Sequence, residues 1–373
     1  MTDRLLLSRV GCTLSRLDTN ELPMFTIHGL WISAQQALTQ VLDRVPATAA
    51  ARRRRALQRV VRAPNQVSSR IQIKVAETHE EFVAALRLLH DSYVNLGYAD
   101  AAPDGVRVTP YHLLPTTTVL IAKIDDTVIG TLSVIKDSPL GLPSEAIIDI
   151  RRLRRRGRQV AEASSIAIDP SFRDGGVLFL LLKYLWHNLT KCDIRYLLVS
   201  VNPRHETFYE DILLFRRRAT KTISGYSFVN GAPAVPMSLD LLHAAERYRK
   251  VYGAAKGRHN LHRFFVEDTA PNLSFPDSTL TVGCRSLSRY TLSWLHRTNA
   301  LQAHLGNAVF RTAMRMIYGD GPTRATGLNS TLDRLELDEA TLANSQWMRF
   351  TTAVKPDGMS LETKRNAASG IDA

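Results

Sequence analysis

Hydrophobic and polar residues alternate with two different periods along the middle of the chain, and this pattern predicts an α/β fold. Residues 70–75 alternate in steps of two, as expected for a strand buried on one side. From residue 79 onward, apolar positions recur every three to four residues and place Phe82 and Tyr93 on one face of a helix. Thr78 and Glu81 precede this face with the spacing of a capping box, so we expect the helix to begin there.

The same kind of pattern continues to residue 241. In chain order, the sequence predicts strands over residues 118–124, 128–135 and 162–169, a helix over 175–189, a strand over 194–201, a helix over 202–215, and a closing hairpin formed by 226–229 and 234–241. Asn230 and Gly231 lie between the arms of this hairpin and are typical of a tight turn. Strands that alternate with helices in this order predict a mixed central sheet flanked by helices.

These patterns divide the chain into four predicted parts. Residues 1–66 form a helical, basic N-terminal extension, and residues 67–245 form the α/β domain. Residues 246–354 keep helical periodicity and form a C-terminal extension. Residues 355–373 are small and polar with Pro, Gly and Ser, so we expect a disordered tail. The sequences of the extensions predict no function for them.

The charge of the chain is unusual for its composition. Its 373 residues are 45% hydrophobic, which suffices for one full core, yet the net charge is +13. This excess predicts an acidic partner, and arginines concentrate in residues 52–55, 151–158 and 216–218. Each run is also compatible with a solvated face. We expect no nucleic acid, because no zinc finger, aromatic RNA-binding pair or basic zipper accompanies the charge.

The sequence predicts a cytoplasmic protein without a membrane-spanning helix. No run of about 18 apolar residues occurs. Charged residues such as Arg9 interrupt the apolar stretch near the N-terminus, so no signal peptide is expected. Cys12, Cys192 and Cys284 lie far apart without metal or redox spacing, which fits reduced thiols. The basic charge leaves peripheral contact with a membrane open.

A strand, a small-residue turn and a helix form the most informative motif. Residues 173–178, Arg-Asp-Gly-Gly-Val-Leu, begin a predicted helix whose first N–H groups lack intrahelical partners and can hold a phosphate. The next strand leads into residues 202–209, which begin with Asn and end with Tyr. Together these motifs resemble the core of the GNAT superfamily of N-acyltransferases, although Leu178 replaces a small residue. The resemblance implies a GNAT-type fold with helical N- and C-terminal extensions.

A narrower resemblance covers a little under half of the chain. The segments that carry it are Tyr93-x4-Tyr98, Arg107-x-Thr-x-Tyr111-His-Leu-Leu-Pro115, Gly130-Thr131, Asp137-x3-Gly141-Leu-Pro143, Glu162-x-Ser-x-Ile-Ala-Ile-Asp169, Asn202-Pro-Arg-His-x3-Tyr209 and Val229-Asn-Gly-Ala-Pro-Ala-Val235. With them, residues 71–242 resemble the FeeM-type N-acyl amino acid synthases, relatives of the acyl-homoserine-lactone synthases. The family joins a long acyl chain from acyl carrier protein to the amino group of an amino acid. Ser165 replaces an Arg of the lactone synthases, which argues against S-adenosylmethionine as the amine donor.

This resemblance implies roles for residues of the α/β domain. The ammonium group of an amino acid must lose a proton before it attacks a thioester, and Glu162 is the candidate base, acting through a water molecule. Backbone groups around Ile166 and Ile168 are the expected donors to the oxyanion, and Tyr209 is the candidate acid for the departing thiolate. The donor is an acyl-phosphopantetheine thioester, as acyl carrier protein or acyl-CoA. Its phosphate is expected to bind Arg173, Gly175 and Gly176.

The acceptor site is expected in the long connection over residues 95–115. A guanidinium matches the two oxygens of a carboxylate, so Arg107 is the candidate for the carboxylate of the amino acid. Tyr98 and Tyr111 share the connection and are expected to line the site. The structural alternatives are a surface charge for Arg107 and an ion pair with a preceding arginine for Glu162. A tyrosine that only packs its ring is the alternative for Tyr209.

The arginines that precede Glu162 predict where a carrier protein docks. Acyl carrier proteins are strongly acidic, so arginines beside the pantetheine slot would attract one. The candidates are Arg151, Arg152, Arg154, Arg155, Arg156 and Arg158.

Two other functions stay open on the sequence. One is an acetyl-CoA-dependent N-acetyltransferase acting on a protein or small amine, and the other is a non-catalytic acyltransferase-like module that binds through its basic face. A deep apolar channel for a long acyl chain distinguishes the first alternative from the main hypothesis. No cluster of His, Cys, Asp or Glu has metal-ligand spacing, so no metal site is expected.

Overall fold

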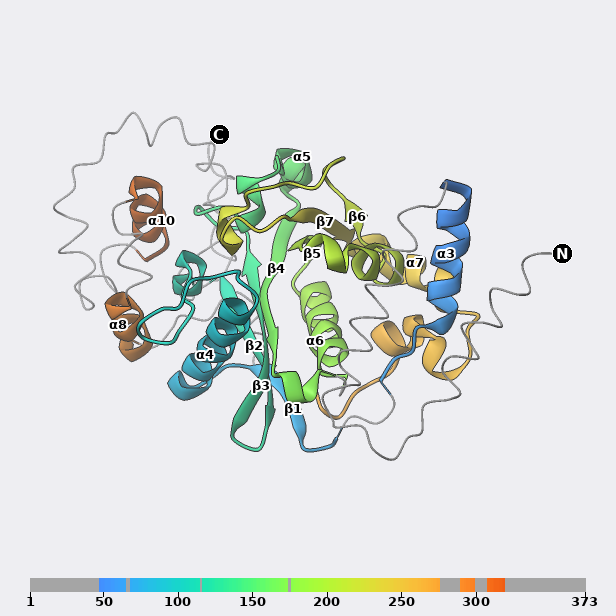
Figure 1. Ribbon diagram of the computed structural model, residues 1–373, viewed down its shortest axis with the longest axis horizontal. Coiled ribbons are helices and arrows are strands. Elements are labelled where there is room, and N and C mark those ends of the chain that lie inside the picture. Colours follow the sequence, from blue (N-terminus) through green and yellow to red (C-terminus); the bar gives the residue numbers. More distant parts are fainter. Residues whose placement is uncertain are drawn as a thin grey trace, which may run out of the picture.

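A seven-stranded mixed sheet forms the centre of the computed structural model, which describes residues 47–64, 68–114, 116–173, 176–275, 289–298 and 307–318 (Figure 1). The strand order is β1-β2-β3-β4-β5-β7-β6. The strands are β1 (Ile71–Val75), β2 (Thr117–Ile124), β3 (Thr127–Lys136), β4 (Gln159–Ile168), β5 (Ile194–Val201), β6 (Arg216–Arg217) and β7 (Val235–Asp240). The helices are α3 (Ala47–Val60), α4 (His79–Asn95), α5 (Arg151–Arg154), α6 (Val177–Lys191), α7 (Leu241–Tyr252), α8 (Arg289–Arg297) and α10 (Ala308–Tyr318).

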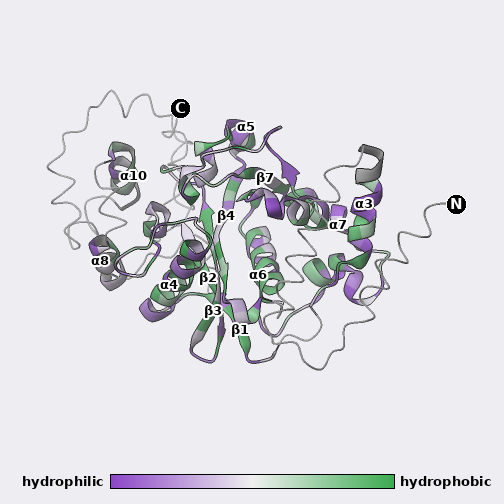
Figure 2. Ribbon diagram, in the orientation of Figure 1, coloured by the Kyte–Doolittle hydropathy of each residue, from purple (hydrophilic) through white to green (hydrophobic). Residues whose placement is uncertain are grey.

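Helices cover both faces of the sheet because its central strands are apolar on both sides. In β2, Leu120 and Ala122 belong to the core cluster shared with α6, whereas Val119 and Ile121 belong to the cluster shared with α4. Successive side chains of a strand point to opposite faces, so one strand serves both cores. Figure 2 shows the hydrophobic residues along β2, β4 and α6. This arrangement confirms the predicted mixed sheet flanked by helices.

The sequence predicted the start of α4 and the hairpin that follows it. The Thr78 hydroxyl accepts a hydrogen bond from the Glu81 N–H at 3.2 Å, as a capping box requires. The Glu81 carboxylate accepts from the N–H of Glu77 at 2.9 Å rather than from that of Thr78. The bounds of β2 and β3 match the predicted ranges to within one residue.

The sheet separates between its two parallel strands. Strands β4 and β5 pair in parallel from Gln159 opposite Ile194 to Glu162 opposite Leu198, whereas every other neighbouring pair in the described sheet is antiparallel. Beyond this point β4 continues along β3 and β5 continues along β7. The facing edges of β4 and β5 therefore no longer pair with each other. Their backbone donors and acceptors can bind an extended ligand that contains amide groups.

Two predicted elements differ from the structure. Residues 226–229 were predicted as a strand, but Ser227–Val229 form a 3-10 turn and β7 instead pairs with β5 and the short β6. Asn230 and Gly231 have φ angles of 52° and 76°, so they do form a tight turn. The predicted helix over 202–215 is a 3-10 turn followed by a π-helical turn, Phe208–Ile212. Leu214, at φ 61°, reverses the chain and prevents a longer helix.

Helix α3 lies at one end of the domain and helices α8 and α10 lie at the other (Figure 1), whereas the first part of the C-terminal extension lies beside α3, where the Ala63 N–H donates to the Arg258 carbonyl at 2.7 Å. Helix α3, within the predicted basic extension, is joined to the π-helical turn by an ion pair between Arg54 and Asp211 at 2.6 Å. Leu295 of α8 and Phe310 of α10 belong to the same core cluster as Phe82 of α4. The amphipathic helix expected around residues 30–45 and the tail over 355–373 lie outside the described residues. No helix within the described ranges is long and apolar enough to cross a membrane.

Candidate active site

Glu162 lies at the point where β4 and β5 separate, and its side chain is buried. Only 1% of its surface is exposed, and Ser144 donates two hydrogen bonds to Oε2, from its backbone N–H at 2.9 Å and from Oγ at 2.7 Å. Burial raises the pKa of Glu162 to about 7, against the opposing effect of the two Ser144 hydrogen bonds. No ion pair with a described arginine holds this carboxyl, in contrast to the structural alternative. It can therefore exchange a proton near neutral pH.

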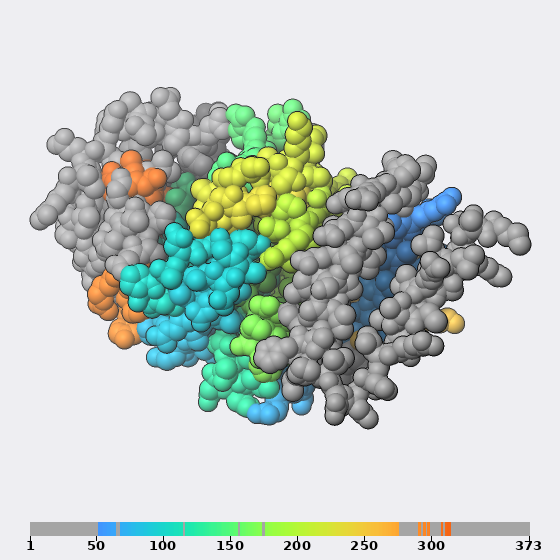
Figure 3. All heavy atoms as spheres, in the orientation of Figure 1, coloured from blue at the N-terminus to red at the C-terminus, as the bar shows by residue number. Residues whose placement is uncertain are grey.

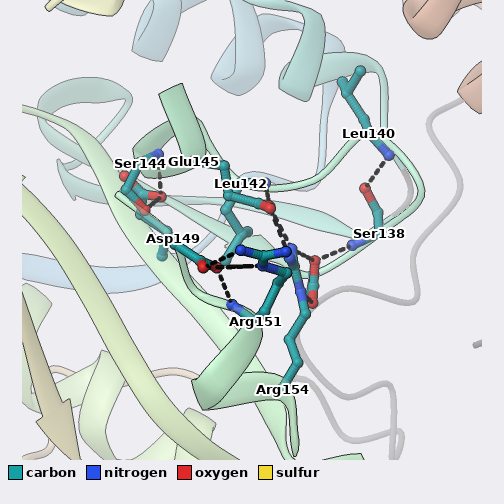
Figure 4. A network of polar contacts seen from close by, with 10 residues as sticks. Ser138, Leu140, Leu142, Ser144, Glu145, Asp149, Arg151 and Arg154 are labelled. Carbon is teal, nitrogen blue, oxygen red and sulfur yellow. Dashed lines mark hydrogen bonds and ion pairs between the residues drawn. The ribbon is translucent and has the colours of Figure 1, made fainter. Parts of the chain in front are cut away.

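Ser144 is held in place by a buried ion-pair network. It lies in the 3-10 turn Pro143–Ala146, next to Glu145. Arg154 donates to Asp137 from Nε at 2.6 Å and from Nη2 at 2.8 Å, and it donates from Nη1 to Glu145 at 2.6 Å (Figure 4). A planar guanidinium that satisfies two carboxylates fixes both ends of the connection that carries Ser144.

This network corrects one predicted role. Arg154 was expected to face a carrier protein, but only 9% of its surface is exposed and its donors are committed to Asp137 and Glu145. Arg151 is exposed but paired with Asp149 at 2.7 Å, and Arg158 donates to the Tyr196 hydroxyl at 3.2 Å. Arg152 and Arg155 are exposed, and the side chain of Arg156 lies outside the described part.

The hydroxyl groups of Tyr111 and Tyr226 lie near the Glu162 carboxyl. Burial raises the pKa of Tyr111 above its ordinary value, and the Glu162 carboxylate raises it further. Burial and the same carboxylate raise the pKa of Tyr226, whose hydroxyl also lies near Tyr111 and Tyr93. Both phenols stay protonated at neutral pH and can donate hydrogen bonds to a substrate or an intermediate. Tyr111 was predicted to line the site, whereas Tyr226 was assigned to a strand.

Arg107 lies beside these tyrosines. Above it, the surface segment that carries Asp100 meets the one that carries Asn230. Its Nη2 donates to the carbonyl of Phe228 at 2.6 Å, and its guanidinium lies 4.6 Å from the ring centre of Tyr93. Asn230 donates to Asp100 at 3.2 Å, and Figure 3 shows the corresponding cyan and yellow segments in contact. The buried Nε of Arg107 has no hydrogen-bond partner among the described residues. A buried donor without a partner is costly, so this atom can bind a ligand oxygen.

Burial lowers the pKa of Arg107 from its ordinary value, but a guanidinium keeps its charge at neutral pH. Tyr226 connects the part of the site around Arg107 with the part around Glu162, because its hydroxyl interacts electrostatically with the Arg107 guanidinium and with the Glu162 carboxylate. Tyr98 contacts the ring of Tyr93 edge-on at 5.8 Å and lies under the guanidinium of Arg204. Its described contact with the site is therefore the one between its ring and the ring of Tyr93.

His112 supports the site from within the core. Its Nδ1 accepts a hydrogen bond from the Thr109 N–H at 3.0 Å, so Nε2 carries the proton toward Ser133 Oγ, 3.3 Å away. Burial lowers its pKa to about 3, and the positive charge of Arg107 adds to this effect. The imidazole is thus neutral and holds the connection that carries Arg107 and Tyr111 against β3.

A bulge in β4 frees a backbone donor next to these side chains. Ser133 pairs with Ser164, but the following pair joins Thr131 to Ala167, so two residues of β4 bulge out of the ladder. Ser165 has a φ of 54° at this bulge. Burial raises the pKa of the Tyr93 hydroxyl, and the nearby backbone N–H of Ile166 acts in the opposite direction. Ile168, by contrast, remains paired with Gly130 in the ladder.

Tyr209 lies in the π-helical turn after β5. Its side chain is buried, with the ring of Phe208 at 5.6 Å and that of Phe215 at 5.5 Å. Burial raises its pKa, and the Tyr93 hydroxyl raises it further. Tyr209 is therefore a neutral phenol close to Tyr93, whose ring packs in the core and whose hydroxyl keeps its proton at neutral pH.

The predicted phosphate turn leads into α6. Gly176 caps the helix with a φ of 76°, a conformation that favours glycine. Helix α6 begins at Val177. The first N–H groups of this helix point toward its N-terminal end and have no intrahelical partners. Arg173 donates from Nε to the carbonyl of Ile168 at 3.2 Å. Gly175 lies outside the described residues.

Sequence reasoning did not identify Ser144 or Tyr226 as part of this site. Ser144 lies in a connection without a periodic pattern, Tyr226 was assigned to a strand, and the fold alone brings each of them near Glu162. The only signal was their position in or next to the segments Asp137–Pro143 and Val229–Val235 of the family resemblance. In the described part of the chain, no group of three or more His, Cys, Asp or Glu residues is placed to hold a metal ion.

Comparisons with known proteins agree with this architecture. Residues 84–240, less than half of the chain, match the family model described as N-acyl amino acid synthase FeeM. This match confirms the family resemblance, and its range includes Glu162, Arg107 and Tyr209. No curated protein matches the chain. The matched domain and its strand arrangement are those of an acyltransferase with the GNAT-type fold.

Similar solved structures include acyltransferases of several kinds. FeeM, an N-acyl amino acid synthase from uncultured soil microbes, is 25% identical, with 47% of this chain and 93% of that chain covered and a TM-score of 0.42. BjaI, a CoA-dependent acyl-homoserine lactone synthase, is 13% identical, with 58% and 98% covered and a TM-score of 0.39. An N-acetyltransferase from Staphylococcus aureus Mu50 is 19% identical, with 46% and 98% covered and a TM-score of 0.32.

Proposed function

We propose that this protein joins a long-chain acyl group, carried as a phosphopantetheine thioester on acyl carrier protein or CoA, to the amino group of an amino acid. The observation that supports this best is one buried site containing both a carboxyl with a pKa of about 7 and an arginine with an unpaired donor. The carboxylate of Glu162 can accept a proton from an ammonium group near neutral pH. Arg107 can hold the carboxylate of the same substrate.

The acyl donor in this proposal lies between β4 and β5. Its phosphate binds the first N–H groups of α6, beside Arg173, Gly175 and Gly176. Its pantetheine arm contains two amides, which suit the backbone edges of β4 and β5 beyond Glu162 and Leu198. The thioester would then lie at the point of separation, next to the bulge at Ser165.

The chemical step begins with the acceptor. Glu162 takes a proton from the ammonium group through a water molecule and leaves a neutral amine. The nitrogen lone pair attacks the thioester carbon, so that a C–N bond forms and the carbonyl oxygen becomes an oxyanion. Donors to this oxyanion are the Ile166 N–H and the Tyr93 hydroxyl, which lie next to each other at the bulge.

Collapse of the intermediate completes the transfer. The C–S bond breaks, and Tyr209 gives its proton to the departing thiolate. A second proton of the attacking nitrogen passes to Tyr209 and regenerates the phenol, and Glu162 releases the proton that it took from the ammonium group to solvent. The products are an N-acyl amino acid and a free thiol. In this proposal residues 67–245 are the catalytic unit, and the protein works in the cytoplasm, where carrier-protein and CoA thioesters are made.

A product survey tests this function. The purified protein is incubated with acyl donors from acetyl to palmitoyl, on CoA and on carrier protein, and with a mixture of amino acids, and the products are identified by mass spectrometry. We expect N-acyl amino acids from the long-chain donors. Acetylated products alone would favour an acetyl-CoA-dependent N-acetyltransferase. No product from any donor would contradict an acyltransferase role for this site.

A further inference from the structure

A basic groove lies between α3, α7 and β6, outside the site described above. It has a volume of about 640 Å³ and is lined by five basic side chains and one acidic one: Arg54, Arg55, Arg216, Arg247, Lys250 and Glu210. Leu214, Phe215 and Val251 form apolar parts of its wall. The groove therefore combines positive charge with an apolar surface.

Much of this positive charge is not neutralised within the described part of the protein. Arg54 pairs with Asp211 at 2.6 Å, and Lys250 pairs with Glu246 at 3.4 Å. Arg55, Arg216 and Arg247 form no ion pair with a described residue. Arg216 and Arg247 line the same groove, and the pKa of Arg247 is lowered by burial and further by the positive charge of Arg216. Like charges without counter-charges favour an anionic partner.

The groove is adjacent to the donor end of the candidate site. Phe215 lines the groove, and its ring centre lies 5.5 Å from that of Tyr209. Arg53 of α3 donates to the hydroxyl of Thr207 at 2.7 Å, so α3 lies along the segment that carries Tyr209. Helix α3 lies outside residues 84–240, so the groove is built partly from the N-terminal extension.

We infer that this groove is the docking site of the acidic acyl carrier protein that delivers the acyl donor. The inference rests on the proposed function and narrows its donor. A carrier-protein surface offers carboxylates beside apolar side chains, which matches the arginines and the apolar wall of the groove. The segment 151–158 fits this role less well, because Arg154 is buried in an ion-pair network and Arg151 is paired. The lining residues of α3 also share one helix face, since residues 51, 54, 55 and 58 have the spacing i, i+3, i+4 and i+7.

Charge reversal in the groove tests the inference. The variant Arg55→Glu/Arg216→Glu alters two exposed side chains and leaves the Arg54–Asp211 pair intact. The matched control, Arg152→Glu/Arg155→Glu, makes the same charge change in the other arginine-rich segment. Binding of fluorescently labelled holo carrier protein is measured by anisotropy at low and at physiological salt. Electrostatic complementarity predicts at least a tenfold loss of affinity at low salt for the groove variant and a small change for the control.

Two results with the variants would overturn the inference. One is an equal affinity of the groove variant and the wild type, and the other is a loss confined to the control variant. Activity with acyl-pantetheine, which has no protein surface, should be the same in all three proteins. If no donor of any kind yields product but the groove variant still loses carrier binding, the proposed function fails and the docking site stands. If acyl-CoA yields product but carrier protein does not bind the wild type, the docking inference fails and acyl transfer stands.

Discussion

Ser144 donates two hydrogen bonds to the same carboxylate oxygen, Oε2 of Glu162, at 2.9 Å and 2.7 Å. The two donors stabilise the charged form of a carboxyl that burial would otherwise keep protonated. The remaining oxygen, Oε1, accepts no hydrogen bond from the described residues and is the one that can receive a proton. Ser144 therefore sets both the orientation and the basicity of the candidate base.

The pH dependence of the reaction tests this relationship. Because the pKa of Glu162 is about 7 and the base must be deprotonated, the rate should rise with pH up to about 7 and level off above it. Ser144→Ala removes one donor to the charged form, so the midpoint should move upward by about one pH unit. The control is Ser138→Ala, since Ser138 lies in the same connection and bonds to the N–H of Leu140 instead (Figure 4). A midpoint that is unchanged in Ser144→Ala would contradict the role of this pair.

The acceptor site can be tested at Arg107. Arg107→Lys keeps the charge but removes the planar pair of donors that matches a carboxylate. We expect the KM for the amino acid to rise about tenfold to a hundredfold, the loss typical of a hydrogen bond to a charged group. An amino acid amide, which has no carboxylate, serves as the control acceptor and should discriminate little between the two proteins. Equal effects on both acceptors would assign Arg107 to packing.

The donor turn can be tested at Gly176. Its φ of 76° favours glycine, and a side chain at the start of α6 would lie beside the helix N–H groups that are proposed to bind the phosphate. Gly176→Val should therefore weaken donor binding first, measured as the KM for acyl-CoA. Gly97→Val is the matched control, because Gly97 has a φ of 69° and no described atom lies within 4 Å of the position that a Cβ would take. A loss of turnover with unchanged donor KM would count against the phosphate site.

The ion-pair network around Arg154 predicts a stability effect. Arg154→Met leaves the carboxylates of Asp137 and Glu145 without their buried counter-charge, so the free energy of unfolding should fall by about 3–5 kcal/mol. Arg152→Met, at an exposed position in the same segment, should change it by less than about 0.5 kcal/mol. Urea unfolding of the two variants makes the comparison. Similar values would mean that Arg154 behaves as a surface charge.

The elements predicted from the sequence were those in which local periodicity and tertiary packing agree. Helix α4 and the β2–β3 hairpin have the expected bounds, because their apolar faces are also the faces they bury. The family resemblance also identified Glu162 as the candidate base, within a segment that the sequence predicted as a strand. The bulge beside it was not predicted, because an L-residue with a positive φ, Ser165, leaves no periodic signal.

Contacts between distant segments could not be predicted in the same way. Ser144 reaches Glu162 from a connection without regular structure, and the fold alone brings the two together. The arginine run over 151–158 looks uniform in sequence, yet Arg154 is buried while Arg152 is exposed. Which arginine points inward depends on Asp137 and Glu145, and no local pattern reveals their approach. The same limit applies to Tyr226, whose position depends on the turn at Asn230.

The central claim is that this site acylates an amino acid with Glu162 as the base. The most direct test is the rate at which Glu162→Gln forms N-acyl amino acid from a long-chain donor at about pH 8, compared with the wild type. Gln keeps the size of the side chain but cannot accept the proton, so turnover should fall about 10²- to 10⁴-fold while circular dichroism and thermal unfolding show a folded protein. A folded variant that forms the product at the wild-type rate would contradict the account.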